Sequence, residues 1–445
     1  MIDELLTLAA DAVAQARKLG ADAADALAID RHGTDIELRE GQIEKLEQAE
    51  ARELGLRVFA GQSSAMIAGS VLTHEAIARL AETAVAMARL APPDPYSGLA
   101  EAKLLAREFA DLDLVSASLP DAGQLKQMAL AAEAAALGVR GVAKSGGASA
   151  SAADRAMALA TSNGFASGYR RTGVSVSVSA IAGEGTAMER DYDYSSTVHF
   201  ADLKSPEEVG ASAGRRAARR IAPRKVKSQS VPVLFENRIA GSLLGHLASA
   251  INGAAIARGT SFLKERMGQK IFASGIVVSD DPLRRRGLGS RPFDGEGLAV
   301  QARNLVDDGM LTGWLLDLHS ARQLQLAPQG NGARGLSSPP SPSSSNLYLR
   351  PGTETPETLL RRMGRGLLVT EMIGINLNAV TGDYSRGASG FWVEDGELAF
   401  PVSEITIAGN LKDMFLNLTP ADDLEFRGAV NAPSCLVEGL TIAGI

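Results

Sequence analysis

Cysteine and aromatic side chains are scarce in this chain of 445 residues. Its single cysteine is Cys435, and aromatic residues make up 4% of the sequence. One cysteine excludes an intrachain disulfide and any zinc or iron–sulfur site that is built from several cysteines. Low cysteine usage is typical of a reducing compartment, so the sequence predicts a cytoplasmic location. Because Cys435 precedes an apolar segment, we expect it to be a buried, small hydrophobic residue.

The sequence also has no surplus of positive charge and no long apolar run. Lys and Arg number 45 against 52 for Asp and Glu, which gives a net charge of −7. Proteins that hold DNA through its phosphates normally carry a positive surplus, so we expect no nucleic-acid partner. No stretch reaches the roughly 18 apolar residues of a membrane-spanning helix, and acidic residues follow Met1 where a secretory signal has basic ones. We therefore expect no membrane association.

Histidine is too sparse to build a zinc motif. The chain has 5 histidines, and no two stand at the His-x-x-x-His spacing that places two ligands on one helix face. His74-Glu75 begins like such a motif, but Ala78 occupies the place of the second histidine. We interpret His74 as a surface residue in the first turn of a helix that Thr73 caps.

Hydrophobic periodicity predicts an α+β protein with three parts. Residues 1–95 and residues 110–222 show the same order, in which helices flank strands that alternate between apolar and polar residues. Such alternation is typical of an antiparallel sheet with one solvated face. The expected elements of this N-terminal α/β region are helices over 2–19, 74–90, 121–138 and 205–221, with strands within 23–70 and over 155–161 and 172–182.

The third part, residues 228–445, is predicted to be one large β-rich domain. Turn signals at 307–309 (DDG) and 394–396 (EDG) separate short alternating segments. An apolar stretch over 238–256 is expected to form one helix within this domain. Residues 337–345 are too rich in proline and serine for a helix or a central strand, so we expect a mobile or extended loop.

A run of seven basic residues lies between Arg215 and Lys227. Such a run can be a nucleic-acid patch or a targeting signal. It can equally be the solvated face and C-terminal end of a helix, where cations suit the helix dipole, followed by a linker. The acidic total favours the second interpretation.

One segment, residues 381–392, combines polar, charged and aromatic side chains between glycines. Glycine permits close backbone approach, and Arg386 offers a planar fork for carboxylates. Tyr384 and Trp392 add amphipathic contact area. This composition is compatible with a binding site and equally with a hairpin whose charges satisfy one another.

Five stretches of the chain resemble the TldD/PmbA family and, within it, the PmbA branch, which is also called TldE. They are residues 381–394 (TGDYSRGASGFWVE), 401–414 (PVSEITIAGNLKDM), 245–253 (GHLASAING), 292–297 (PFDGEG) and the segment around 39–61. The resemblance implies an α/β N-terminal region, a β-rich C-terminal domain, and cytosolic metallopeptidases that act on unfolded or extended peptides. For the TldD branch it implies a His-Glu-x-x-x-His helix that binds zinc, with a cysteine as a further ligand. For the PmbA branch it implies a TldD-like chain as the partner in a heterodimer.

The helix that would carry the metal motif departs from that pattern. Aligned on residues 259–261 (GTS), its three motif positions are Leu244, Gly245 and Ser249. Leucine and glycine have no ligand atom, serine is a poor zinc ligand, and glycine cannot act as a general base. His246 lies on the same helix at another position. We expect no catalytic residue, no metal and no cofactor on this chain, with zinc on the partner subunit.

The resemblance and this departure lead to one main hypothesis. The chain would be a non-catalytic subunit of a heterodimeric cytosolic zinc metallopeptidase and would help to form a chamber for extended peptides. The residues that we expect at the substrate or at the partner are Asp383, Tyr384, Ser385, Arg386 and His246. Two alternatives stay open: an adaptor or binding protein without a peptidase role, and a stand-alone homodimeric peptidase with an atypical centre.

Overall fold

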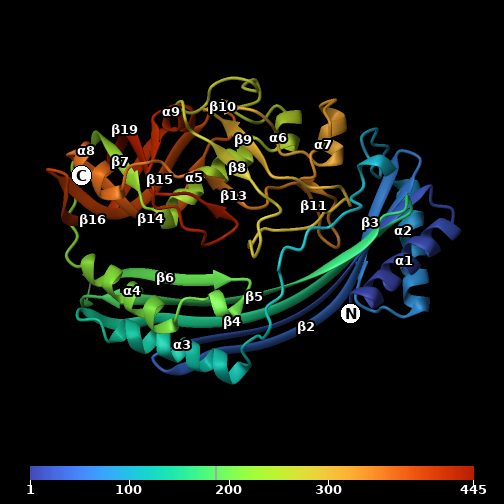
Figure 1. Cartoon of the computed structure of the whole chain (residues 1–445), viewed down its shortest axis with the longest axis horizontal. Helices are drawn as coiled ribbons and strands as arrows, with labels where there is room; N and C mark the ends of the chain where they lie inside the picture. The colour runs from blue at the N-terminus through green and yellow to red at the C-terminus, as the bar shows by residue number, and fades with distance from the viewer. Residues whose placement is uncertain (186–187, 445) are drawn as a thin grey trace.

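The computed structural model describes residues 1–185 and 188–444 and has two lobes (Figure 1). The N-terminal lobe is a long, curved, six-stranded sheet that passes beneath a C-terminal lobe of shorter strands, helices and loops. This arrangement confirms the predicted α+β class, with an antiparallel sheet first and a strand-rich region after it. None of the helices in the described ranges is long and apolar enough to cross a membrane.

The N-terminal lobe follows the predicted order of helices and strands. In chain order its elements are α1 (Ile2–Lys18), β1 (Ala23–Arg39), β2 (Gln42–Ala60), β3 (Ser63–Gly69), α2 (His74–Leu90), α3 (Ala122–Leu137), β4 (Val142–Thr161), β5 (Ala166–Ala182), β6 (Glu189–Thr197) and α4 (Pro206–Arg219). The predicted helix over 74–90 is confirmed, and the Thr73 side chain accepts a hydrogen bond from the Ala76 amide as its N-cap. His74 is exposed on its first turn, as predicted.

Alternate residues along the strands supply the two faces of this sheet. Even-numbered side chains of β1, β4 and β5 face the helices: Ala26 packs with α1 and α2, and Val176 packs with α3 and α4. Odd-numbered side chains point the other way, where Leu27 and Leu159 share a cluster with Phe293 of the C-terminal lobe. All four helices therefore cover one face, and the opposite face carries the C-terminal lobe.

The two N-terminal modules expected from the sequence share this one sheet, whose strand order is β3-β2-β1-β4-β5-β6. β1 pairs with β4 from Asp25 opposite Thr161 to Leu38 opposite Ala148. The sequence predicted this strand only at 155–161, because the alanines and serines before it alternate without a strong apolar signal. The longer β4 joins the two halves of the lobe.

The C-terminal lobe is organised around a sheet that closes on itself. Its strands are β7 (Gln229–Phe235), β14 (Gly366–Leu377), β15 (Asp383–Glu394), β16 (Glu397–Asn410), β17 (Leu418–Pro420) and β19 (Cys435–Ala443). β16 pairs with both β15 and β19, so the sheet β16-β15-β14-β7-β19 forms a small closed barrel. Helix α5 (Asn237–Ala250) lies in the same apolar core as these strands and contributes Leu243, Leu244 and Leu247 to it.

The predicted single helix over 238–256 is wrong in one respect, because the chain forms two helices there. Helix α5 ends at Ala250, and α6 (Gly253–Ala257) follows after a break. The Asn252 side chain accepts hydrogen bonds from the Ala254 and Ala255 amides and so starts a new helix. Asparagine is a strong N-cap residue, and an apolar pattern alone does not reveal such a break.

The proline- and serine-rich segment over 337–345 is extended, in agreement with the sequence. Within it, β12 (Ser341–Pro342) pairs antiparallel with β11 (Gly332–Ala333). Proline has no amide hydrogen to donate to a neighbouring strand. It is tolerated here because this short pair is not part of a central sheet.

The close packing of α4 on α3 depends on glycine, which gives a first prediction. A Cβ atom added at Gly210 would lie 2.1 Å from the Ala132 carbonyl oxygen on α3. We expect Gly210→Ala to destabilise the protein by about 1–3 kcal/mol, because the helices must separate. The midpoint of thermal unfolding is the measurement.

The matched control for this substitution is Gly245→Ala on α5, where an added Cβ has no neighbour within 4 Å. This change should leave stability unaltered or raise it by up to about 1 kcal/mol, because alanine is the better helix former. Equal unfolding midpoints for the two variants would contradict the close approach of α3 and α4.

Candidate functional site

Helix α5 carries the three positions of the degenerate metal motif in three different environments. Leu244 is 2% exposed and belongs to the apolar core. Gly245 faces open space, since a Cβ atom added there would meet no atom within 4 Å beyond its chain neighbours and the backbone of its own helix. Ser249 is exposed, and its hydroxyl donates to the Gly245 carbonyl oxygen at 3.0 Å. The helix therefore turns an apolar side to the core, and the motif positions on its outer side, Gly245 and Ser249, carry no good metal ligand.

These residues do not fit a catalytic zinc ion. A catalytic site needs three protein ligands and a polar group that activates water, and Leu244 and Gly245 offer none. Within residues 1–185 and 188–444, no three His, Cys, Asp or Glu side chains are arranged to hold a metal ion.

Cys435 is buried at the start of β19, as the sequence predicted, with 1% of its surface exposed. Its thiol donates to the Pro433 carbonyl oxygen at 3.2 Å. Burial, reinforced by the nearby Asp423 carboxylate, raises the pKa of this thiol well above its ordinary value. The thiolate that would bind zinc or attack a substrate is therefore disfavoured.

Three of the predicted site residues come together between α5 and β15. The rings of His246 and Tyr384 meet edge to face, with centroids 5.7 Å apart. Arg386 lies next to both rings, and its Nε donates to the Gly374 carbonyl oxygen at 2.6 Å. The Nε2 atom of His246 and the hydroxyl of Tyr384 are buried without a hydrogen-bond partner among the described residues.

Both rings are uncharged at neutral pH. Burial, and to a smaller extent the Arg386 guanidinium, lowers the pKa of His246. Burial raises the pKa of Tyr384 to about 12, and Arg386 opposes this shift. Buried polar atoms are normally hydrogen-bonded, so two unpaired atoms on neighbouring rings mark a place where a ligand or partner group can bind.

The remaining predicted residues, Asp383 and Ser385, are satisfied by their own hairpin. The Asp383 carboxylate accepts from the Thr381 hydroxyl at 2.6 Å and from the Asn410 amide at 2.9 Å, and these bonds lower its pKa. Ser385 lies half-buried in the ladder between Asn376 and Ala408. The hairpin interpretation of this segment thus holds for Asp383, and a contact of these two residues with substrate stays a prediction.

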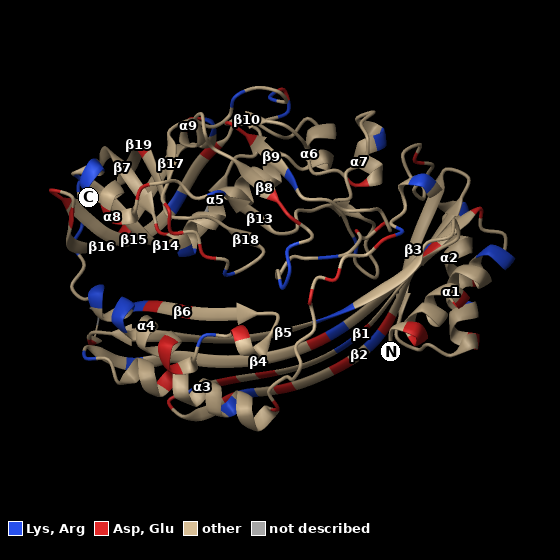
Figure 2. Cartoon of the chain, viewed as in Figure 1, with Lys and Arg blue, Asp and Glu red and all other residues tan. Residues whose placement is uncertain are grey.

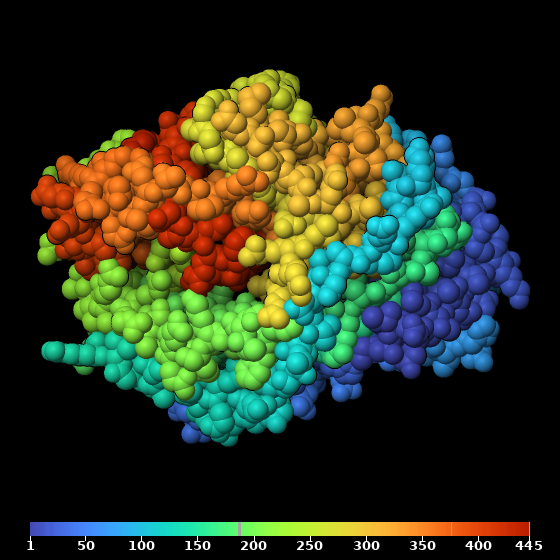
Figure 3. Space-filling model, in the orientation of Figure 1, coloured from blue at the N-terminus to red at the C-terminus, as the bar shows by residue number. Residues whose placement is uncertain are grey.

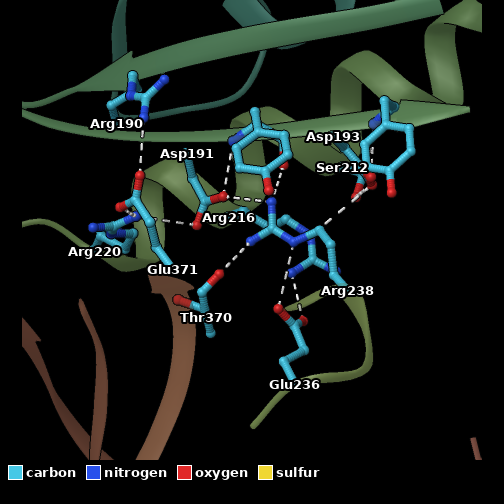
Figure 4. A network of polar contacts seen from close by, with 12 residues as sticks. Arg190, Asp191, Asp193, Ser212, Arg216, Arg220, Glu236, Arg238, Thr370 and Glu371 are labelled. Atoms are coloured by element: carbon cyan, nitrogen blue, oxygen red, sulfur yellow. Dashed lines mark hydrogen bonds and ion pairs between the residues drawn. The ribbon is translucent and has the colours of Figure 1, made fainter. Parts of the chain in front are cut away.

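A network of buried charges joins the two lobes (Figure 4). The Arg238 side chain on α5 is fully buried, pairs with Asp191 of β6 at 2.8 Å and donates to the Thr370 carbonyl oxygen at 3.0 Å. The Arg220 side chain, 4% exposed, pairs with Glu371 of β14 at 2.7 Å and with Asp191 at 3.5 Å. Asp191 therefore binds a guanidinium from each lobe.

The basic run over 215–227 is for the most part the solvated helix end and linker that the sequence predicted. Helix α4 ends at Arg219, and the exposed members of the run are Arg215, Arg219, Arg224, Lys225 and Lys227. Other contacts of the run were not predicted. Arg216 pairs with Glu236 at 2.5 Å, and Arg220 is buried in the network. Arg224 covers the ring of Phe400 at 4.6 Å. The acidic and aromatic partners come from distant parts of the chain, so composition near the run could not reveal them.

Beside this network, a cleft of about 760 Å³ opens between the lobes. The seam between the green residues of the N-terminal lobe and the orange and red residues of the C-terminal lobe is seen in Figure 3. The sequence did not predict this cleft, although Arg215, Arg216 and Arg219 of the basic run line it. The other charged residues that line the cleft are Asp193, Lys204, Glu208, Glu236, Glu357, Arg361, Glu397, Asp423, Glu425 and Arg427.

Comparison with known proteins agrees with this architecture. Three family models cover most of the chain: PmbA/TldA metallopeptidase domain 1 at residues 24–88, the central domain at 117–221 and the C-terminal domain at 228–444. The chain is 38% identical over 414 residues to Metalloprotease PmbA of Escherichia coli O157:H7, across 93% of this chain and 90% of that protein.

Two solved structures have the same fold over nearly their whole length. A putative modulator of DNA gyrase from Bacteroides thetaiotaomicron superposes with a TM-score of 0.92 and 28% identity, covering 100% of both chains. TldE from Thermococcus kodakarensis superposes with a TM-score of 0.89 and 18% identity, covering 98% of this chain and 100% of that one. The chain belongs to the PmbA/TldD metallopeptidase family. Within that family, it is a member of the PmbA branch.

The buried network gives a prediction for stability. Arg220→Ala leaves Asp191 and Glu371 without this partner, so we expect a loss of about 3–5 kcal/mol in the free energy of unfolding. Arg190→Ala is the control, because Arg190 pairs with the same Glu371 at 2.9 Å but is 58% exposed. Its effect should stay within about 1 kcal/mol. Similar unfolding midpoints for the two variants would show that burial does not govern this contact.

Proposed function

We propose that this chain is the non-catalytic subunit of a heterodimeric cytosolic zinc metallopeptidase, with a TldD-like chain as the catalytic partner. The observation that carries the proposal is the environment of the motif positions on α5. Leu244 packs in the core, Gly245 has no side chain, and Ser249 bonds its own helix. The zinc, its ligands and the general base must then come from the partner.

The role of this chain is to complete a chamber that holds an extended peptide. β14 supports this role because β7 pairs with it only from Leu367 to Val369, while β15 follows it as far as Leu377. Beyond Val369, one edge of β14 is therefore not used by β7. A peptide that adds to a strand edge gains main-chain hydrogen bonds without much dependence on its sequence.

The group formed by His246, Tyr384 and Arg386 suits the same role. Leu377, at the end of the β14 edge, pairs with Tyr384. The orphaned Nε2 of His246 and hydroxyl of Tyr384 can bond a main-chain group of the peptide or of the partner. Because both rings are neutral, they bind without introducing a buried charge.

The proposal is tested by comparing the purified chain alone with the same chain mixed with a TldD-like partner. Bound zinc and cleavage of an unfolded polypeptide are measured for each chain and for the mixture. We expect no stoichiometric zinc and no cleavage from this chain alone, and strong cleavage on mixing. Zinc and chelator-sensitive cleavage by the isolated chain would instead identify a homodimeric peptidase. If mixing does not increase cleavage of the unfolded polypeptide, an adaptor role is favoured.

Arg386→Ala tests the role of the group formed by His246, Tyr384 and Arg386 within the complex. We expect peptidase activity of the mixture to fall by about tenfold, because a charge-assisted contact beside His246 and Tyr384 is lost. Complex formation by gel filtration and the unfolding midpoint should be unchanged. Arg350→Ala, an exposed arginine of the same lobe, is the matched control and should keep full activity. Unchanged activity of Arg386→Ala in an intact complex would exclude this role.

A further inference from the structure

A second cavity, of about 160 Å³, lies between the sheet of the N-terminal lobe and two loops of the C-terminal lobe. Four arginines line it: Arg155 on β4, Arg171 on β5, and Arg291 and Arg334 on the loops. Figure 2 shows basic bands on the strands where the sheet passes beneath the C-terminal lobe. The cavity therefore concentrates positive charge in a protein whose net charge is −7.

The strand register brings like charges face to face. Arg155 lies directly opposite Arg171 on one side and opposite Arg31 on the other. Like charges at directly opposed positions destabilise a sheet. Arg31 is compensated by Glu53 at 2.9 Å. Arg171 instead donates to the Leu288 carbonyl oxygen at 2.5 Å, which leaves its charge without a counter-ion there.

The loop arginines hold buried donors that are not used. The Arg334 side chain is 1% exposed and shares the single Asp25 carboxylate with Arg57. Its Nε and Nη2 atoms, and the Nε atom of Arg291, have no hydrogen-bond partner among the described residues. An unpaired buried donor costs free energy, and a buried guanidinium costs more. Both arginines that carry these donors line the cavity.

The one carboxylate in the cavity wall does not neutralise this charge. Asp294 accepts hydrogen bonds from the amides of Glu296, Leu298 and Gly332, and burial raises its pKa. Burial and the neighbouring Asp294 also raise the pKa of Glu296 to about 8, and Arg57 opposes this shift. Arg334 shares Asp25 with Arg57, and Arg155, Arg171 and Arg291 form no ion pair with a carboxylate among the described residues.

We propose that this cavity is a binding site for an oxyanion, a phosphate or a carboxylate, held by Arg171, Arg291 and Arg334. Planar guanidinium forks match the oxygens of both groups. A cavity near 150 Å³ is large enough for a small organic molecule, so a phosphate or a terminal carboxylate with part of its side chain fits. The apolar part of the lining, formed by Leu27, Met157, Leu159 and Phe293, suits the side chain next to a carboxylate.

Isothermal titration of the isolated chain tests the site at constant ionic strength, set with chloride. The probes are inorganic phosphate, trialanine with a free C-terminus and trialanine amide. We expect saturable binding of one oxyanion per chain. Binding of the free acid but not the amide, in competition with phosphate, identifies a peptide terminus as the source. Binding of phosphate alone identifies a free anion.

Arg171→Gln and Arg291→Gln should each weaken this binding by at least about tenfold. The matched control is Arg170→Gln, next on the same strand but on its other face, where Arg170 pairs with Asp154. Without added oxyanion, the two cavity variants should unfold at the same or a higher temperature than the wild type, because repulsion is relieved. Added phosphate should then raise the unfolding temperature of the wild type and not theirs.

Two results would overturn the proposal. The first is the absence of saturable binding of any probe at millimolar concentration. The second is binding that Arg171→Gln and Arg291→Gln leave intact, or that Arg170→Gln weakens equally. Neither result bears on the subunit role, since the site needs no zinc and no partner chain.

Discussion

The contact between the lobes depends on arginines that are removed from water. Arg238 and Arg220 meet at Asp191, and Glu371 completes the group. A buried ion pair adds little net stability over apolar packing, but the loss of one partner is costly. We interpret these ion pairs as a constraint on geometry: each buried charge must meet its partner, so the lobes can dock in only one relative position. The cleft and the arginine-lined cavity both lie between elements that this docking places.

The sequence predicted much of the fold because its signals there are local. The helix over 74–90 begins at the capping residue Thr73, and the helices over 2–19 and 121–138 follow apolar spacing. Where a signal is weak or comes from elsewhere, the prediction failed. The alanine-rich start of β4 lacks apolar contrast, and Asn252 breaks a helix that periodicity alone extends.

Some features of the candidate site can likewise be predicted from the sequence, and others depend on tertiary packing. The absence of donor atoms at Leu244 and Gly245 is visible in the sequence, since it depends only on residue identity. The contact between His246 and Tyr384 is not visible in the sequence, because it requires the packing of α5 against β15. The arginine-lined cavity was invisible for the same reason. Arg155 and Arg334 are far apart along the chain, and only the crossing of the sheet by the C-terminal lobe brings them together.

The closure of the C-terminal barrel has a consequence for the order in which the chain folds during synthesis. β7 opens this lobe, yet one of its partners is β19, the last strand of the chain, with Phe235 opposite Cys435. The N-terminal sheet pairs strands that are closer in sequence and can form while translation continues. The edge of β7 that pairs with β19 must then stay unpaired until β19 has been synthesised, although its other edge can already pair with β14. An unpaired strand edge can pair with another chain, so the nascent C-terminal lobe is exposed to aggregation during this interval.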